Sequence, residues 1–396
     1  MFLTVLVNMS SFNLTVHVKL KRLMNRSRLQ YLSLIFSVMC LGVSANTYSK
    51  ENTDQHCVTQ DVQTLLGVPV EYVQELRKVC ADLVVLGKRL FFDQHLSRDG
   101  TVSCATCHDP EKAFADGLVV VEGVNGRRGA RNTPTVLNAA LMTSQFWDGR
   151  SRTLEEQAKE PFVNPDEHGL GSHGEVMEII NQLPEYQPLF ESAFGADMTL
   201  MTIDHVAEAI AAYERTLVAA NSPFDRFYFA QEDQALSPAA KAGWQLFNGR
   251  AGCSQCHSIS EKSALFSDNE FHVSGVGLAS IQTQLGELTK KVYAQKNNVT
   301  QHVLSQTEAR AVSELGRFNV TLNPKDIGKF KTPSLRNVAL TAPYMHDGSV
   351  ETLEEVIEIE LYSHSEGDRS LIILTPQEKA YLVEFLKSLT SEVLPR

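Results

Sequence analysis

Apolar residues recur at helical spacing along much of this chain, whereas alternating strand patterns are sparse. The clearest helix begins at Thr202, a capping residue, and stops before Ser222-Pro223. Its apolar face consists of Val206, Ile210, Tyr213 and Leu217. Capping signals predict three more helices: Ser237-Pro238 with Asn248-Gly249 at the far end, and the capping boxes Thr352-x-x-Glu355 and Thr375-x-x-Glu378. The pattern therefore predicts a mainly α fold.

The N-terminus has the pattern of an export signal. Arg26 and Arg28 form a basic region, an apolar region covers 32–43, and Val43-Ser44-Ala45 is a small-residue cleavage site. We expect residues 1–45 to be a signal peptide, with Met24 as a possible true start, and the protein to be periplasmic. The alternative is an N-terminal anchor that stays attached.

Composition fits a globular chain, since 43% of the 396 residues are hydrophobic and 21% are charged. No later segment has the roughly 20 apolar residues that a membrane helix needs, so we expect no membrane span in the mature protein. Removal of residues 1–45 leaves the mature chain strongly acidic, which argues against nucleic acid as a partner. An acidic surface can steer a basic electron donor or simply keep the protein in solution.

The seven cysteines divide into groups. Cys40 lies in the signal, and four others form two C-x-x-C pairs. Cys57 and Cys80 remain, and in an oxidising compartment they are either a disulfide or two independent buried thiols.

Two C-x-x-C-H motifs carry the chemistry: Cys104-Ala105-Thr106-Cys107-His108 and Cys253-Ser254-Gln255-Cys256-His257. On a helical turn the two sulfurs face the same side for thioether bonds to a porphyrin, and the histidine is the proximal iron ligand. A redox dithiol needs no following histidine, and a zinc site needs its ligands clustered. The motifs therefore predict two covalently attached haems c, held at His108 and His257.

The surroundings of the two motifs are weakly repeated. Residues 86–92 precede the first motif and residues 243–247 the second, each as an apolar helix. We expect an N-terminal haem domain at 46–225, which holds the peroxide site, and a C-terminal haem domain at 226–396 for electron transfer or storage. The polar stretch 282–314 is interpreted as a surface insertion.

Beyond the motifs, roughly residues 80–390 resemble the bacterial di-haem cytochrome c peroxidases and their MauG-type relatives. The resemblance rests on Arg131-Asn132-Thr133-Pro134-Thr135, Phe146-Trp147-Asp148-Gly149-Arg150, Ser222-Pro223-Phe224-Asp225, Lys331-Thr332-Pro333-Ser334-Leu335-Arg336-Asn337 and Ala342-Pro343-Tyr344-Met345-His346-Asp347-Gly348. It implies two cytochrome c-like haem-binding domains and peroxide chemistry at the N-terminal haem.

By this resemblance, Gln157 and Glu167 are the acid/base pair at the peroxide site. Heterolytic cleavage of peroxide requires that one oxygen loses a proton and the other gains one, and a positioned carboxylate can carry it. Taken alone, Glu167 would more simply be a solvated loop carboxylate.

The resemblance also assigns Trp147 as an electron stepping stone between the haems, although a tryptophan can equally be a core residue. It implies a calcium ion bound by Asn132 and the main-chain oxygens of Thr341 and Pro343, a ligand set that suits a hard cation.

Two positions depart from the family. Members that need prior reduction carry a distal histidine where this chain has Val124, so we expect an open first haem, as in the MauG-type subgroup. Glu360 stands where other members have Met or Tyr at the second haem. Its carboxylate is expected either to approach the second iron or to pair with a buried cation, with Tyr362 and Met345 as weaker alternative ligands.

The sequence thus predicts an oxidoreductase that reduces hydrogen peroxide with electrons from a small cytochrome or another redox protein. MauG-type oxidation of residues on a partner protein is the first alternative, and a di-haem electron carrier without enzymatic activity is the second. A homodimer is compatible with the sequence.

Overall fold

The computed structural model describes residues 2–9, 12–19, 65–195, 197–295, 306–363 and 372–391. The chain divides into residues 1–52 and residues 53–396. In the first unit, strands β1 (Phe2–Met9) and β2 (Phe12–Lys19) pair antiparallel. The basic and apolar regions of the predicted signal peptide lie outside the described residues.

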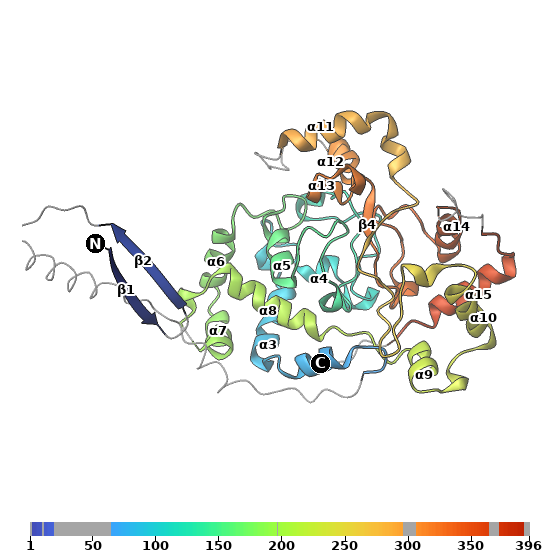
Figure 1. Ribbon diagram of the computed structural model, residues 1–396, viewed down its shortest axis with the longest axis horizontal. Coiled ribbons are helices and arrows are strands. Elements are labelled where there is room, and N and C mark those ends of the chain that lie inside the picture. The colour runs from blue at the N-terminus through green and yellow to red at the C-terminus, as the bar shows by residue number, and fades with distance from the viewer. Residues whose placement is uncertain are drawn as a thin grey trace, which may run out of the picture. The chain divides into compact units, whose positions relative to one another are not determined.

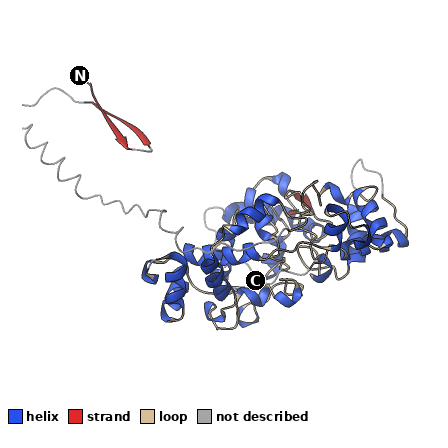
Figure 2. Cartoon of the chain, turned by 90° about the horizontal axis from the view of Figure 1, so that it is seen from below, coloured by secondary structure: helices blue, strands red, loops and turns tan. Residues whose placement is uncertain are grey.

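The second unit is mainly helical, as predicted (Figures 1 and 2). Its α-helices are α2 (Val70–Arg77), α3 (Ala81–Phe91), α4 (Cys104–Cys107), α5 (Leu154–Val163), α6 (His173–Gln182), α7 (Tyr186–Phe194), α8 (Ile203–Thr216), α9 (Pro223–Phe229), α10 (Pro238–Asn248), α11 (Leu285–Gln295), α12 (Gln306–Ser313), α13 (Phe318–Thr321), α14 (Leu353–Ser363) and α15 (Pro376–Lys387). Strands β3 (Phe271–Val273) and β4 (Lys329–Lys331) form a short antiparallel ribbon.

The predicted helix starts are confirmed. Thr202 and Ser237 are the N-caps of α8 and α10, and Thr375 opens α15 with a capping box. Thr352 and Glu355 exchange side-chain and backbone hydrogen bonds before α14. These caps satisfy amide groups that would otherwise lack acceptors in the first helical turn.

The helix that precedes each C-x-x-C-H motif crosses a later helix at a glycine. A Cβ atom on Gly87 of α3 would lie 1.8 Å from the carbonyl oxygen of Ala209 in α8. A Cβ atom on Gly243 of α10 would lie 1.9 Å from the carbonyl oxygen of Tyr381 in α15. Only glycine permits this approach of the two backbones, so the weak sequence repeat corresponds to a repeated helix crossing.

Aromatic packing repeats with the crossing. Phe91 contacts Tyr213 with ring centroids 5.2 Å apart, and Phe247 contacts Phe385 at 4.8 Å. In each pair, the first ring lies four residues after the glycine. The second ring lies four residues after the residue whose carbonyl oxygen the glycine contacts. Figure 1 shows α3, α5 and α8 grouped near α4, and α9, α10, α14 and α15 in a second group.

The predicted insertion has structure of its own. Residues 282–314 include α11 and α12, and a small apolar cluster of Ile281, Leu288, Leu315 and Phe318 holds the segment together. Arg317 donates hydrogen bonds to the carbonyl oxygens of Asp148 and Gly149 at 2.8 and 2.7 Å. Arg317 lies three residues beyond this segment, so the chain that follows the insertion contacts the Phe146–Arg150 string.

A buried ion pair joins distant segments. The Arg336 guanidinium donates to both carboxylate oxygens of Asp225 at 2.8 and 2.9 Å. It also donates to the carbonyl oxygens of Gly67 and Ala264. Both charged side chains are almost fully buried, so the pair ties the start of the described second unit to its later half.

Two further predictions concern covalent links and membranes. Cys80 is in a disulfide bond, and the other half of that bond lies outside the described residues. Within the described parts of the chain, no helix is both long enough and apolar enough to cross a bilayer.

Candidate functional site

The first C-x-x-C-H motif forms the predicted helical turn. Ser103 caps α4 through a capping box with Thr106, which fixes the turn that carries Cys104 and Cys107. His108 follows at once, and its Nδ1 atom lies 3.2 Å from the carbonyl oxygen of Phe114. This bond orients the ring and leaves Nε2 as the atom for iron. Burial lowers the pKa of His108, which favours the neutral, ligand-competent form.

The second motif reaches a similar arrangement through a tighter turn. Cys253–Gln255 is a 3-10 turn, not an α-helical one. The Nδ1 atom of His257 lies 2.9 Å from the carbonyl oxygen of Phe266, so its Nε2 atom is again the candidate iron ligand. Phe247 lies 6.5 Å from the His257 ring, as Phe91 lies 6.4 Å from the His108 ring.

None of the four motif cysteines is in a disulfide bond. Burial raises the pKa of Cys107 to about 12 and that of Cys253 to about 12, and it raises the pKa of Cys104 as well. Reactive redox dithiols have lowered pKa values. The environment therefore disfavours the thioredoxin-like alternative and fits buried attachment points for a large apolar group.

The structure brings Glu167 and Val124 together. The amide of Val124 donates to the carbonyl oxygen of Glu167 at 2.9 Å. Gly123 allows the contact, because a Cβ atom there would lie 2.5 Å from the same oxygen. Burial raises the pKa of Glu167, while Arg150 lowers it, and the amide of Asn164 donates to Oε1 at 2.7 Å. The charge of this carboxyl group also contributes to the raised pKa of Cys107.

A cavity of about 440 Å³ opens beside this loop. Its lining includes Cys107, Asp116, Leu118, Glu122 and Gly123. Gln157 lies half-buried on α5, the helix that leads into the Glu167 loop. The cavity thus joins Cys107 of the first motif to Gly123, next to Val124, while the roles of Gln157 and Glu167 stay predictions.

Trp147 connects the segment that follows the first motif with the segment that follows the second motif. Its indole Nε1 donates to the carbonyl oxygen of Asn132 at 2.9 Å, and its own carbonyl oxygen accepts from the amide of Lys331 at 2.8 Å. The amide of Asn132 donates to the carbonyl oxygen of His346 at 2.9 Å. Hydrogen bonds through Asn132 therefore connect the Phe146–Arg150 turn to the segment around His346.

The predicted calcium ligands lie in the same region. The side-chain nitrogen of Asn132 donates to the carbonyl oxygen of Leu118 at 2.8 Å, which leaves the amide oxygen for a cation. Thr341 and Pro343 lie on the segment that leads to His346, whose carbonyl oxygen bonds Asn132. The arrangement is compatible with a hard cation held by oxygen atoms.

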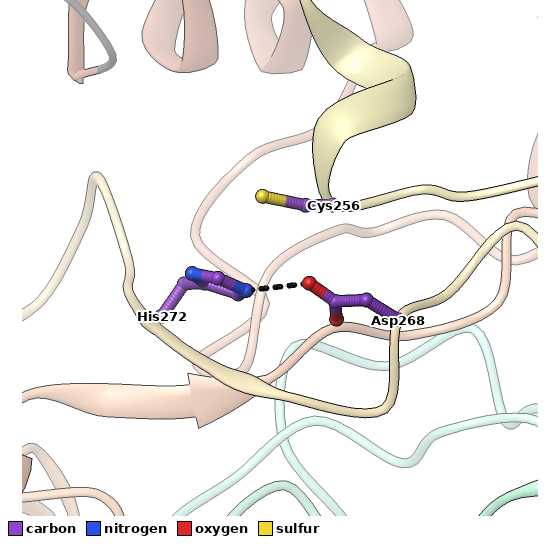
Figure 3. Close-up of side chains that lie close together, drawn as sticks. All are labelled: Cys256, Asp268 and His272. Atoms are coloured by element: carbon purple, nitrogen blue, oxygen red, sulfur yellow. Dashed lines mark hydrogen bonds and ion pairs between the residues drawn. The ribbon is translucent and has the colours of Figure 1, made fainter.

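Glu360 lies close to the second motif. Burial raises its pKa and the imidazole of His272 opposes the shift. Its negative charge in turn raises the pKa of Cys253. Figure 3 shows His272 beside Asp268, with Nε2 to Oδ2 at 2.8 Å, and the sulfur of Cys256 nearby. Tyr362 on the same helix is 69% exposed.

Sequence reasoning missed several buried polar groups. The Nε2 atom of His346 and the Oε2 atom of Glu314 are hydrogen-bonded at 2.7 Å. Asp347 lies close by, and all three residues are buried. Glu214 is buried on α8, near Cys104. Only the amphipathic pattern of α8, in which Glu214 stands between apolar positions, hinted at this last residue.

Comparison with known proteins identifies the family. A model of the di-haem cytochrome c peroxidase family matches residues 81–234. Cytochrome-c peroxidase IdrP1 of a Pseudomonas species is 34% identical over 92% of this chain and 93% of its own length. Methylamine utilization protein MauG of Methylorubrum extorquens is 36% identical over 78% of each chain. Cytochrome c551 peroxidase of Nitrosomonas europaea is 35% identical over 82% of this chain and 84% of its own.

Solved structures agree. A MauG-like protein associated with microbial copper homeostasis superposes with a TM-score of 0.62 at 30% identity, covering 84% of this chain and 95% of that one. The di-haem peroxidase BthA of Burkholderia thailandensis shares the fold, with a TM-score of 0.60 at 22% identity over 84% of this chain and 93% of its own. The chain therefore belongs to the di-haem cytochrome c peroxidase and MauG family and is an oxidoreductase of the peroxidase type.

Proposed function

We propose that this protein is a periplasmic peroxidase with two cytochrome c-like domains, in which hydrogen peroxide reacts beside His108. Haem c is attached through Cys104 and Cys107 and, in the second domain, through Cys253 and Cys256. When bound, the haems supply the redox chemistry of peroxide cleavage. The observation that carries the proposal is the pairing of Val124 with Glu167 next to the first motif.

Glu167 moves the proton that cleavage requires. Its carboxyl group accepts a hydrogen bond from the side-chain amide of Asn164, and its pKa is raised by burial, which suits a group that exchanges protons. Gln157 orients the peroxide from α5. The positive charge of Arg150 opposes this rise in the pKa of Glu167.

Val124 leaves the first iron open. Valine has no atom that can bind iron, and the side chain is buried at 1% exposure beside the Glu167 loop. No conformational activation is then needed before peroxide enters. Asn132 and the main-chain oxygens of Thr341 and Pro343 would bind a calcium ion. The ion would connect the segment after the first motif to the segment before His346.

Trp147 transfers oxidising equivalents toward the second haem. Its indole and its backbone are both fixed by hydrogen bonds to segments from the two halves, so its position varies little. His257 would hold the second haem, which would supply a place for an oxidising equivalent, and Glu360 would tune its potential. A small cytochrome or another redox protein supplies the electrons.

MauG-type oxidation of a partner protein is a second candidate end use. It is favoured by Val124 and by Glu360, because a second haem without an axial methionine lacks the high potential of an electron entry point. Peroxide reduction and partner oxidation would share the reaction with peroxide beside His108. They differ in the electron source, which is a redox protein in the first case and residues of the partner protein in the second.

The test is a stoichiometric reaction with peroxide. Mass spectrometry first establishes two covalently attached haems. The as-isolated ferric protein is then mixed rapidly with one equivalent of hydrogen peroxide, and both haem spectra are followed. We expect a change within the mixing experiment without prior reduction. No change at either haem would overturn the proposal.

A further inference from the structure

The repeated helix crossing allows a comparison of the two halves position by position. The contact of Gly87 with Ala209 corresponds to the contact of Gly243 with Tyr381. Glu214 lies five residues after Ala209 in α8, and Leu386 lies five residues after Tyr381 in α15. Both are buried, at 4% and 7% exposure. In the second half, a leucine therefore fills the position that a glutamate fills in the first half.

A carboxyl group is costly at such a position. The Oε2 atom of Glu214 is buried and has no hydrogen-bond partner in the described part of the chain. A buried polar atom without a hydrogen-bond partner destabilises a fold, and the equivalent leucine shows that the packing does not require a carboxyl group. Groups of this kind are concentrated at functional sites.

The surroundings of Glu214 point to the first haem site. Its negative charge contributes to the raised pKa of Cys104 more strongly than that of Glu167 does. Tyr213, the next residue, packs on Phe91, whose ring in turn lies 6.4 Å from His108. Cys104 itself packs against the apolar cluster that includes Ala211, Ala212 and Tyr213 of α8, so Glu214 is buried in the helix next to the attachment point of the first haem.

We propose that Glu214 is a proton-exchanging group coupled to the oxidation state of the first haem. The carboxylic acid releases its proton to solvent when that haem loses an electron, to peroxide in turnover or to a redox mediator in a titration. The carboxylate takes a proton up again when an electron returns. The negative charge thereby offsets the positive charge gained by the iron in a water-poor site. This inference rests on haem attachment at Cys104 and Cys107.

Other charges around α8 do not neutralise Glu214. Arg215 is committed to Glu155 of α5, with Nη2 to Oε1 at 2.6 Å. Burial raises the pKa of Glu214 to about 8, while Arg215 lowers it and Glu155 raises it. The remaining titratable side chains on the helices packed against α8 are Asp82, Lys88 and Arg89 of α3, Glu156, Lys159 and Glu160 of α5, and His173, Glu175 and Glu178 of α6. Cys104 lies on α4, which packs against the same apolar cluster as α8.

The test is a potentiometric titration of both haems at several pH values. In the unaltered protein, the potential of the first haem should fall as pH rises from 6 to 9, because the anionic carboxylate stabilises the ferric form. In Glu214→Gln and Glu214→Leu, the potential should stay near its low-pH value. Leu is the residue that the second half uses, so Glu214→Leu suits the local packing.

Matched controls separate this effect from others. Glu208→Gln changes an exposed glutamate on the same helix and should leave the pH dependence intact. Glu167→Gln should keep the dependence that belongs to Glu214. The first haem is identified by its altered spectrum in His108→Met, and the mass of each variant confirms that both haems are attached.

Infrared difference spectra provide an independent measurement. Reduction of the unaltered protein near pH 8 should produce the carbonyl band of a protonated carboxylic acid, and Glu214→Gln should lack it. The proposal is overturned if both Glu214 variants retain the full pH dependence, or if no such band appears in the unaltered protein. A protein without attached haem would instead overturn the proposed function.

Discussion

The amide of Val124 donates a hydrogen bond of 2.9 Å to the carbonyl oxygen of Glu167. This bond places the residue that replaces a distal ligand beside the residue proposed to move the proton. The main chains at positions 124 and 167 therefore lie side by side, next to the cavity that Cys107 and Gly123 line. Substitutions at either residue should change the reaction in different, separable ways.

Replacing Val124 with a ligand should close the site. In Val124→His, an imidazole can reach the iron from the open side, so the as-isolated haem should become six-coordinate and low-spin. Its reaction with peroxide should then require prior reduction. Optical and electron paramagnetic resonance spectra would record the change. Val119→His, at a position that is 50% exposed on the same loop, is the control and should retain an open haem.

Removing the Glu167 carboxylate should slow peroxide cleavage. For Glu167→Gln we expect a decrease of about 10²–10⁴-fold, the range that a positioned acid/base group supplies. Stopped-flow mixing would measure the rate. Asp166→Asn removes a neighbouring carboxylate paired with Arg127 at the surface, so it should have little effect. A Glu167→Gln rate equal to that of the unaltered protein would refute this role.

The same residue should set a pH dependence. Burial raises the pKa of Glu167 above the ordinary value of 4.5, and the ionised form is the one that accepts a proton. The rate should therefore fall as pH decreases through this raised pKa and reach a plateau above it. A pH series of the single-turnover rate would show the transition in the unaltered protein and its loss in Glu167→Gln.

Breaking the Arg336–Asp225 pair should destabilise the fold. Arg336→Met leaves the Asp225 carboxylate buried and unpaired, which costs about 3–5 kcal/mol of unfolding free energy. Denaturant titration of the haem-loaded protein would measure it. Arg226→Met removes the adjacent arginine from a half-exposed pair with Glu232 and should cost less than about 1 kcal/mol. Equal losses for the two variants would contradict this explanation.

Neutralising Glu360 should raise the potential of the second haem. A nearby carboxylate stabilises the ferric form, so Glu360→Gln should shift the midpoint upward on the order of 0.1 V, within the ~0.8 V range that haem ligation spans. A spectroelectrochemical titration would measure the shift. Glu358→Gln, at an exposed position on α14 that pairs with Lys379, should leave it unchanged.

Local signals in the sequence predicted much of the fold. The caps at Thr202, Ser237 and Thr375 act within one helical turn, so neighbouring residues suffice to identify them. Thioether attachment likewise depends on a five-residue motif. The 3-10 form of the second motif could not be predicted, because Cys253 and Cys256 have the same spacing as the first pair.

Long-range relationships were beyond the sequence. Arg336 and Asp225 are 111 positions apart, and nothing in either string specifies the other as a partner. The Cys256 sulfur lies beside His272 and Asp268, which are more than ten residues further along the chain. Glu214 looks like an ordinary helical glutamate until its burial and its counterpart Leu386 are known. Roles that depend on such contacts need the three-dimensional structure.

Low-temperature electron paramagnetic resonance of the fully ferric protein tests the central claim most directly. An open iron beside His108, with Val124 on the far side, predicts a high-spin signal from one haem before any reduction. The signal should disappear in Val124→His and persist in Val119→His. A spectrum in which both haems are low-spin would contradict an open peroxide site.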